Sequence, residues 1–219
     1  MLSYLDGYIA GRYFTDKFLC PGVCDDGRGY VFSVFGDSAA LGKYFDNQGV
    51  GLENPDLSGM AFSEEVPAGG KPGKAAWINY AGAELSEWVY DEEQGKYMRF
   101  SQDEHTNYVY KATLDQNTNE QLAFSNVILI KATYTMLQET LFNTDLIGNT
   151  AGQPAIVFRD GNAYEITWKA TDPQKPLQFF DADGNPFPLK PGNSWMALMG
   201  TSTPNVEQDG EWTFQFSIP

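Results

Sequence analysis

The sequence is poor in cationic side chains. Its 219 residues include 14 Lys and Arg against 29 Asp and Glu, so the formal net charge is −15. Nucleic acids are bound through Lys and Arg contacts to phosphates, so this balance argues against nucleic acid as a partner, and it equally disfavours docking on anionic lipid. An acidic surface keeps a protein soluble and also attracts cations, basic peptides or amino sugars.

The sequence also lacks a long apolar run and a targeting segment. Its apolar runs are far shorter than the ~18 residues of a membrane span, and the run in NVILI at 126–130 suits a buried strand. The N-terminal MLSYLDGYIAGRYF carries Asp6 and Arg12 and lacks the basic-then-apolar layout of a signal peptide. We therefore expect no signal peptide in this chain and no direct membrane insertion.

Cysteine and histidine are scarce. Cys20 and Cys24 lie in CPGVC, which suits either a small disulfide ring, typical of an oxidising compartment, or two thiols near a turn. A zinc site needs further ligands that the single histidine, His105, does not complete. As a general base His105 needs a nucleophile, and the sequence has no Gly-x-Ser-x-Gly elbow to supply one. We predict no metal, no cofactor and no catalytic residue.

What the chain does contain indicates strands and tight turns. Apolar residues make up 42% and aromatic residues 15%, which is typical of a globular protein, and Gly and Pro are frequent. Near the N-terminus, the spacing of apolar residues predicts a helix over 3–19. GYVFSVF at 29–35 then predicts a buried strand, and a Gly-Asp-Ser turn leads into a second helix. Residues 1–65 are therefore expected to form a small helix–strand–helix domain.

The pattern changes after VPAGGKPGK, residues 66–74, which has the composition of a linker. From residue 75 to 219, short aromatic and β-branched segments alternate with turn sequences, which indicates a β-rich domain. The expected fold class is α+β: the small N-terminal part followed by a mainly antiparallel β domain, arranged as a sheet, a sandwich or an open barrel.

Two Asp-Gly-Asn turns lie in this region, in FRDGNAYEI and FDADGNPFPL. The second resembles the opening of a calcium loop. Counted from Asp181, however, Pro186 stands where an EF-hand needs Gly, and Gly192 stands where it needs Glu. Asp-Gly and Gly-Asn also supply the positive φ angles of tight hairpins. We therefore predict two structural turns.

The strand-to-helix turn Gly36-Asp37-Ser38 is the candidate ligand site. Backbone N–H groups at a helix N-terminus bind anions, although the Asp37 carboxylate can occupy that position as a cap. A plain capped turn is the alternative.

Several ordered segments resemble a known family. They are YDEEQGKYMRF, FSNVILIKA, GQPAIVFRDGNAYEITWKA and FFDADGNPFPLKPGNSWMAL, and together they are similar to the C-terminal domain of YerB-type bacterial lipoproteins. VFSVFGDSAALGKYFDNQGVGLENPDL is similar to the end of that family's N-terminal domain. The resemblance implies an extracytoplasmic, lipid-anchored protein with two domains of unknown biochemical function. It also implies that the lipobox and part of the N-terminal domain have no counterpart in this chain. It supplies no catalytic residues.

Three functions remain open at this point. The first is a non-enzymatic binding or scaffold protein for an envelope ligand or protein, with tryptophans available to stack on sugars: Trp77, Trp88, Trp168, Trp195 and Trp212. The second is a hydrolase of an envelope glycan that pairs Asp37 with Asp91 or Asp103. The third is an assembly subunit that binds another protein. We expect the first.

Overall fold

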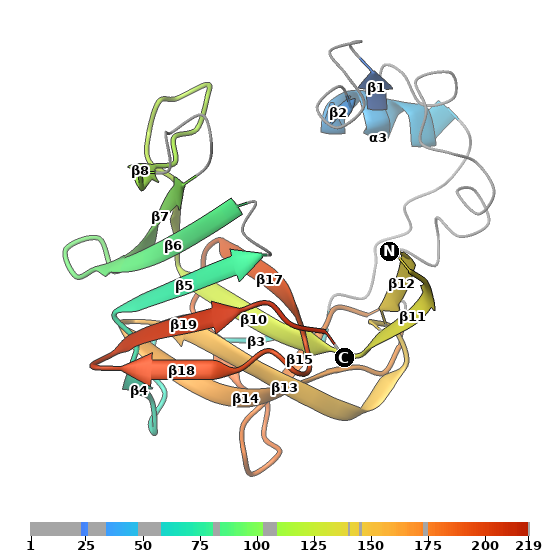
Figure 1. Cartoon of the computed structure of the whole chain (residues 1–219). Coiled ribbons are helices and arrows are strands. Elements are labelled where there is room, and N and C mark those ends of the chain that lie inside the picture. The colour runs from blue at the N-terminus through green and yellow to red at the C-terminus, as the bar shows by residue number, and fades with distance from the viewer. Residues whose placement is uncertain are drawn as a thin grey trace. The chain divides into compact units, whose positions relative to one another are not determined.

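The computed structural model (Figure 1) describes residues 23–25, 34–47, 58–80, 84–102, 109–139, 141–144, 146–172 and 175–218. The chain divides into two units. Unit 1 comprises Met1–Leu57 and Pro173–Lys175, and unit 2 comprises Ser58–Asp172 and Pro176–Pro219. The helix predicted over residues 3–19 lies outside the described residues, as do Cys20, Asp103 and His105. No helix in the described ranges has the length and apolar character needed to cross a membrane.

Unit 1 corrects the predicted fold class. Its described part is an antiparallel pair, β1 (Val23–Asp25) and β2 (Val34–Gly36), followed by the ten-residue α3 (Ser38–Asn47). The α+β class with its helix–strand–helix start is wrong, because the described chain is nearly all β and α3 is its one helix. A strand needs a hydrogen-bonded partner, and the partner of β2 comes from CPGVCDDGRG, residues 20–29, whose Pro-Gly and Asp-Gly pairs are typical of a loop.

Unit 2 is built on two large sheets. The seven-stranded sheet has the order β18-β19-β5-β6-β7-β8, with β9 also on β7. Its strands are β5 (Ala75–Tyr80), β6 (Glu84–Asp91), β7 (Lys96–Gln102), β8 (Lys111–Ala112), β9 (Ala123–Phe124), β18 (Asn205–Gln208) and β19 (Glu211–Gln215). Most neighbours in it are antiparallel, but β19 runs parallel to β5. The last strand of the chain therefore lies beside the first strand of the sheet (Figure 1).

The six-stranded sheet has the order β15-β14-β13-β10-β17, with β4 also on β14. Its strands are β4 (Lys71–Pro72), β10 (Asn126–Ala132), β13 (Asn149–Arg159), β14 (Asn162–Ala170), β15 (Gln178–Phe180) and β17 (Ser194–Gly200). The pair β10–β17 is parallel. Two smaller pairs complete unit 2, namely β3 (Ala61–Phe62) with β16 (Pro188–Leu189) and β11 (Tyr134–Gln138) with β12 (Leu141–Thr144).

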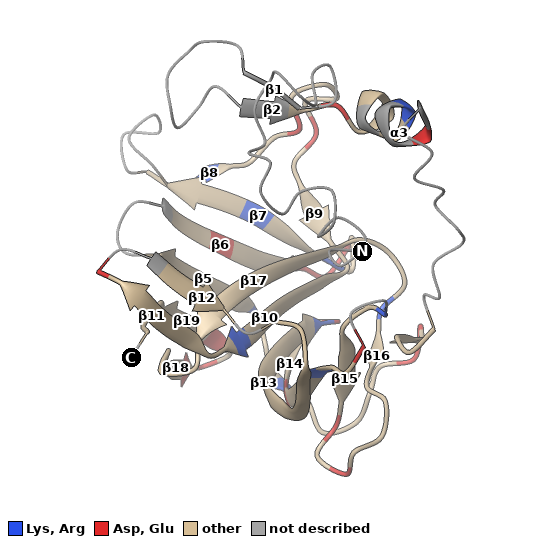
Figure 2. Ribbon diagram, turned by 90° about the vertical axis from the view of Figure 1, so that its right-hand side faces the viewer, with Lys and Arg blue, Asp and Glu red and all other residues tan. Residues whose placement is uncertain are grey.

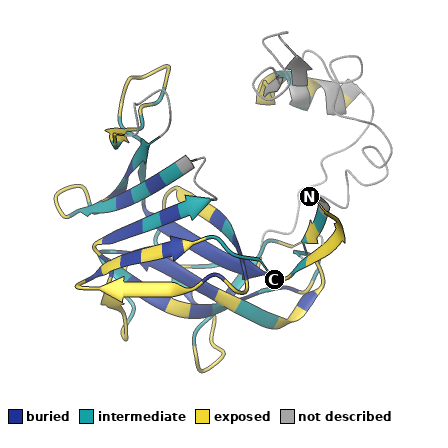
Figure 3. Ribbon diagram, in the orientation of Figure 1, coloured by how far each residue is buried: buried dark blue, intermediate teal, exposed yellow. Residues whose placement is uncertain are grey.

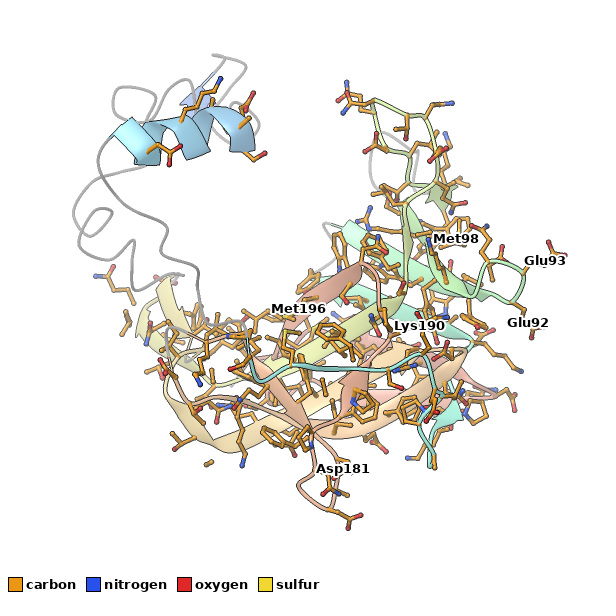
Figure 4. All side chains as sticks on the ribbon, turned by 180° about the vertical axis from the view of Figure 1, so that it is seen from behind. Glu92, Glu93, Met98, Asp181, Lys190 and Met196 are labelled. Atoms are coloured by element: carbon orange, nitrogen blue, oxygen red, sulfur yellow. The ribbon has the colours of Figure 1, made fainter. Side chains whose placement is uncertain are left out.

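Both Asp-Gly-Asn sequences form turns, as predicted. Asp160 and Gly161, with φ of 52° and 71°, make the two-residue turn that joins β13 to β14. In the second turn the Asp181 carboxylate accepts hydrogen bonds from the backbone N–H groups of Asn185, at 2.8 Å, and Asp183, at 3.0 Å. These hydrogen bonds hold the pKa of Asp181 below its ordinary value, and the bond from Asn185 has the largest effect. Asp181 therefore stabilises its own turn, on a loop that projects from the sheet (Figure 4).

The two sheets differ in how many of their faces are buried. The main core lies between them and takes Trp88, Trp212 and Phe214 from the seven-stranded sheet and Leu129 and Phe158 from the six-stranded one. A second core covers the opposite face of the six-stranded sheet. Every residue of β10 is accordingly buried, as the run NVILI predicted. The seven-stranded sheet is buried on one face, and half-buried and exposed residues alternate with buried ones along β5, β6 and β19 (Figure 3).

Arg159 fastens the segment before β4 to the six-stranded sheet. Its side chain is fully buried and forms an ion pair with Asp160, 2.8 Å from Nε to Oδ2. Its terminal nitrogens donate to the backbone carbonyls of Pro188, Ser63 and Glu65 at 2.9–3.1 Å. One guanidinium thus joins the turn of the β13–β14 hairpin to two other segments.

Residues 66–74, the predicted linker, belong to unit 2 and include β4. Gly73 lies so close to β14 that a Cβ there would come within 2.6 Å of the backbone of Asn162 and Ala163. Its carbonyl accepts a hydrogen bond from the buried Tyr97 hydroxyl at 2.8 Å. The glycine therefore permits close packing of this segment on the sheet.

Candidate functional site

The outer face of the seven-stranded sheet, opposite the main core, carries a row of side chains that crosses four strands. Strand pairing places Thr213 of β19 beside Trp77 of β5, Trp77 beside Glu87 of β6, and Glu87 beside Phe100 of β7. The neighbours of these residues along each strand point into the core, and side chains alternate between the two faces of a sheet. We call Thr213, Trp77, Glu87 and Phe100, with Tyr110, the outer row.

The outer row has an aromatic wall. Tyr110, just before β8 (Lys111–Ala112), packs edge-on against Trp77 with their ring centroids 5.1 Å apart. Trp77, Tyr110 and Phe100 are each partly exposed. Trp and Tyr present a large apolar surface together with a polar N–H or O–H group, which suits a ligand with apolar and polar faces.

A carboxylate lies in the middle of this wall. Burial, and secondly the charge of Glu211, raise the pKa of Glu87 to about 7. Both influences act in the same direction. The pKa of the Tyr110 hydroxyl is also raised, mainly by burial and secondly by the charge of Glu87. Figure 2 shows an acidic position part-way along β6 and a basic position on the neighbouring β7. Arg99 of β7 is buried on the core side of the sheet. Glu87 is therefore a half-buried acid that is partly protonated near neutral pH.

Polar side chains flank the outer row. Asn79 of β5 and Gln215 of β19 lie opposite each other, two residues beyond Trp77 and Thr213, and the Asn79 amide donates to Gln215 Oε1 at 2.7 Å. Glu211 lies two residues before Thr213 and is exposed. Aromatic rings, amides and carboxylates thus share one face of the sheet.

Replacing Glu87 with glutamine is expected to weaken the pH dependence of stability. The folded-state pKa of about 7 lies above the ~4.3 of an unfolded chain, so the folded protein binds the extra proton between these values. The free energy of unfolding therefore falls as pH rises through this window. After discounting for solvent screening at a half-buried site, this loss is about 1 kcal/mol between about pH 5 and pH 8.

Urea denaturation of wild type and Glu87→Gln at both pH values measures this effect. Glu92→Gln, at the exposed tip of the β6–β7 hairpin, removes the same charge and is expected to follow wild type (Figure 4). An equal loss of stability in wild type and Glu87→Gln would contradict a raised pKa at Glu87.

Comparison with known proteins places the chain in a family. The sequence model described as "Protein of unknown function (DUF3048) C-terminal domain" matches residues 76–196, more than half of the chain. The chain belongs to this family. It is also similar in structure to the YerB protein from Bacillus subtilis, with a TM-score of 0.62 and 18% identity. That match covers 90% of this chain and 63% of YerB, so the chain spans less than two thirds of YerB. No curated protein matches the sequence.

The resemblance to the YerB-type family, first drawn from the motifs, is confirmed as far as membership of this family of unknown function. In the structure, several motif residues have packing roles. The Tyr97 hydroxyl donates to the Gly73 carbonyl, and Arg159 joins three segments. Asn126 is fully buried, and its amide donates to Lys190 O at 2.9 Å and Ser194 Oγ at 3.0 Å. These residues therefore stabilise the fold.

Arg99 lies behind the outer row, in the main core. Its guanidinium is 4.9 Å from the ring centroid of Trp195 and 5.7 Å from that of Trp88, and it donates to Ser86 Oγ at 3.0 Å and to Thr113 Oγ1 at 2.9 Å. Cation–π contacts of this kind strengthen when they are desolvated. Arg99 thus holds β6 and β7 together directly beneath Glu87 and Phe100.

The predicted site, Gly36-Asp37-Ser38, lies in unit 1 at the start of α3, and all three residues are exposed. Asp37 Oδ1 accepts a hydrogen bond from the Ala40 backbone N–H at 2.8 Å, so its carboxylate caps the helix. Ligand binding at these three residues stays a prediction.

The structure separates the five tryptophans that were considered as sugar stackers. Trp88, Trp168 and Trp212 are fully buried, and Trp195 packs partly buried against the main core. Trp77 faces outward. Of the carboxylates considered for hydrolysis, Asp91 accepts hydrogen bonds from Gln94 in the β6–β7 turn, and Asp37 caps α3. Glu87 was missed, because the charge and apolar neighbours that perturb it come from distant segments.

Proposed function

We propose that this chain is a non-enzymatic binding protein that acts outside the cytoplasm and holds a saccharide on the outer face of its seven-stranded sheet. The observation that carries this proposal is the outer row, in which Trp77 and Tyr110 form an aromatic wall beside Glu87. The similarity to the YerB-type lipoprotein family supports an extracytoplasmic location, where envelope glycans are available as ligands.

A saccharide fits the chemistry of this face. Sugar rings have an apolar C–H face that packs on aromatic rings and a rim of hydroxyl groups that needs hydrogen-bond partners. Trp77 and Tyr110 offer the rings, while Glu87, Asn79 and Gln215 offer donors and acceptors. A ligand site typically combines an apolar surface with a few polar groups that fix orientation. The net charge of −15 argues against a polyanionic ligand on the same face.

Calorimetric titration with hexamers of N-acetylglucosamine, glucosamine and glucose tests the proposal. Replacing Trp77 with alanine removes the largest ring of the wall, and we expect at least about tenfold weaker binding, equivalent to ~1.4 kcal/mol. Phe62→Ala is the matched control, because Phe62 is also an exposed aromatic residue but lies on β3. Failure of all three saccharides to bind, or equal binding by wild type and Trp77→Ala, would refute the proposal.

Hydrolysis of an envelope glycan is the second candidate, and the raised pKa of Glu87 favours it. A glycosidase acid is a carboxyl group whose pKa is raised so that it stays protonated near neutral pH. If wild type released reducing ends from the same hexamers and Glu87→Gln did not, the protein would be a glycan hydrolase and not a non-enzymatic binding protein.

A further inference from the structure

We infer that the saccharide carries a free amino group, and that Glu87 and Glu211 receive its ammonium on the outer face of the sheet. This inference rests on the proposed saccharide-binding function and names the class of sugar. Its basis is charge complementarity on an aromatic sheet face: two carboxylates share this face with Trp77 and Tyr110.

The groups that surround Glu87 come from β19, β5, β7 and the segment before β8. On β19, Glu211 adds a second negative charge that acts on Glu87. On β5 and β7, its direct neighbours are the uncharged Trp77 and Phe100. Tyr110 lies in the segment before β8, and the pKa of its hydroxyl is raised by burial and secondly by the charge of Glu87. The cations of β7 are Arg99, which is buried on the core side between tryptophan rings, and the exposed Lys96, which lies opposite Asp91 at the end of the hairpin.

An ammonium group relieves this arrangement. A positive charge beside a half-buried carboxylate favours the ionised carboxylate and offsets its repulsion from a second acid. The adjacent indole and phenol rings also attract a cation through their π faces. The protein's net charge of −15 raises the local concentration of cationic ligands.

The aromatic wall favours an amino sugar over a bare metal ion. Calcium needs six to eight oxygen ligands, and the described residues contain no group of three or more His, Cys, Asp or Glu side chains placed to hold a metal. A sugar amine uses both parts of the site, because its ring packs on Trp77 while its ammonium contacts Glu87.

A second consequence distinguishes an amine from a neutral sugar. Glu87 is partly protonated near neutral pH, and a bound ammonium lowers its pKa. At about pH 6 the free sugar amine is already largely protonated, and Glu87 also carries its proton. Binding of the ammonium at this pH therefore releases the proton of Glu87 to the buffer, whereas binding of an acetylated sugar leaves that proton in place. Calorimetry in two buffers of different ionisation enthalpy detects this release.

The test compares the glucosamine hexamer with the N-acetylglucosamine hexamer at about pH 6, where Glu87 and the sugar amine are both largely protonated before binding. We expect wild type to bind the glucosamine hexamer at least about tenfold more tightly and with proton release. Glu87→Gln is expected to bring the ratio of the two affinities close to one and to abolish the release. Glu211→Gln is expected to reduce the ratio less. Glu92→Gln, which removes a charge from the distant hairpin tip, is expected to match wild type (Figure 4).

The possible outcomes distinguish the amino-group inference from the saccharide-binding function on which it rests. Equal affinity for both hexamers would overturn the amino-group inference and leave saccharide binding intact. Failure of both to bind would overturn the amino-group inference, and failure of the glucose hexamer as well would overturn saccharide binding. A hexalysine peptide that binds as tightly as the glucosamine hexamer would show that the face selects cations and not sugars.

Discussion

Replacing Arg159 with methionine is expected to lower the free energy of unfolding by about 3–5 kcal/mol. The substitution keeps an unbranched apolar side chain but removes every donor of a fully buried guanidinium. The backbone carbonyls of Pro188, Ser63 and Glu65 then lose this partner, and Asp160 keeps only its ion pair with Lys190, at 2.7 Å. Buried polar groups that are left unsatisfied carry their full desolvation cost.

Urea denaturation of the whole chain measures this loss. Lys71→Met is the matched control, because it removes one cation from an exposed ion pair with Glu165, and exposed pairs contribute about 0–1 kcal/mol. Similar losses in the two variants would mean that Arg159 does not hold these segments together.

The second large effect is expected at Trp168. This residue is fully buried in the second core, and its indole N–H donates to the Lys131 carbonyl at 2.8 Å. Truncating a buried tryptophan to alanine costs about 3–5 kcal/mol, because it removes apolar contacts and leaves a cavity. We expect Trp168→Ala to show this loss in urea denaturation.

Trp77→Ala provides the contrast. Trp77 is only partly buried, so its removal is expected to cost about 1–2 kcal/mol of stability. Its main effect is expected on saccharide binding. If Trp168→Ala unfolded at the same urea concentration as wild type and bound saccharide more weakly, the roles assigned to these two tryptophans would be reversed.

Local sequence signals predicted the features that depend on neighbouring residues. Asp160-Gly161 supplies two positive φ angles in succession, so the β13–β14 hairpin follows from the sequence alone. The four successive apolar residues VILI within NVILI point to both faces of the sheet, so burial of both faces of β10 also follows from the sequence. The Asp37 cap of α3 is also predictable from local sequence, because the capping hydrogen bond joins Asp37 to Ala40, three residues later.

Features that depend on distant pairing were not predictable in this way. The residues of β1 carry turn signals, and their pairing with β2 overturned the helix–strand–helix prediction. Residues 66–74 have the composition of a linker, but their glycines allow this segment to pack closely on β14, about 90 residues later in the chain. No local sequence pattern shows this contact.

The candidate site was missed for the same reason. Trp77 was among the possible sugar stackers, but the sequence does not show which tryptophans face outward. Glu87 was inconspicuous among 29 acidic residues. Its environment depends on the parallel pairing of β19 with β5, which brings Glu211 near it from the other end of unit 2.

The central claim is that a saccharide packs on Trp77, and the indole N–H signals in a ¹H–¹⁵N NMR spectrum test it most directly. The chain has five tryptophans, and the Trp77→Ala spectrum identifies the signal of Trp77. On titration with the glucosamine hexamer, we predict a progressive shift of the Trp77 signal, while those of the buried Trp88, Trp168 and Trp212 stay in place. A Trp77 signal that does not move at saturating hexamer would contradict the account.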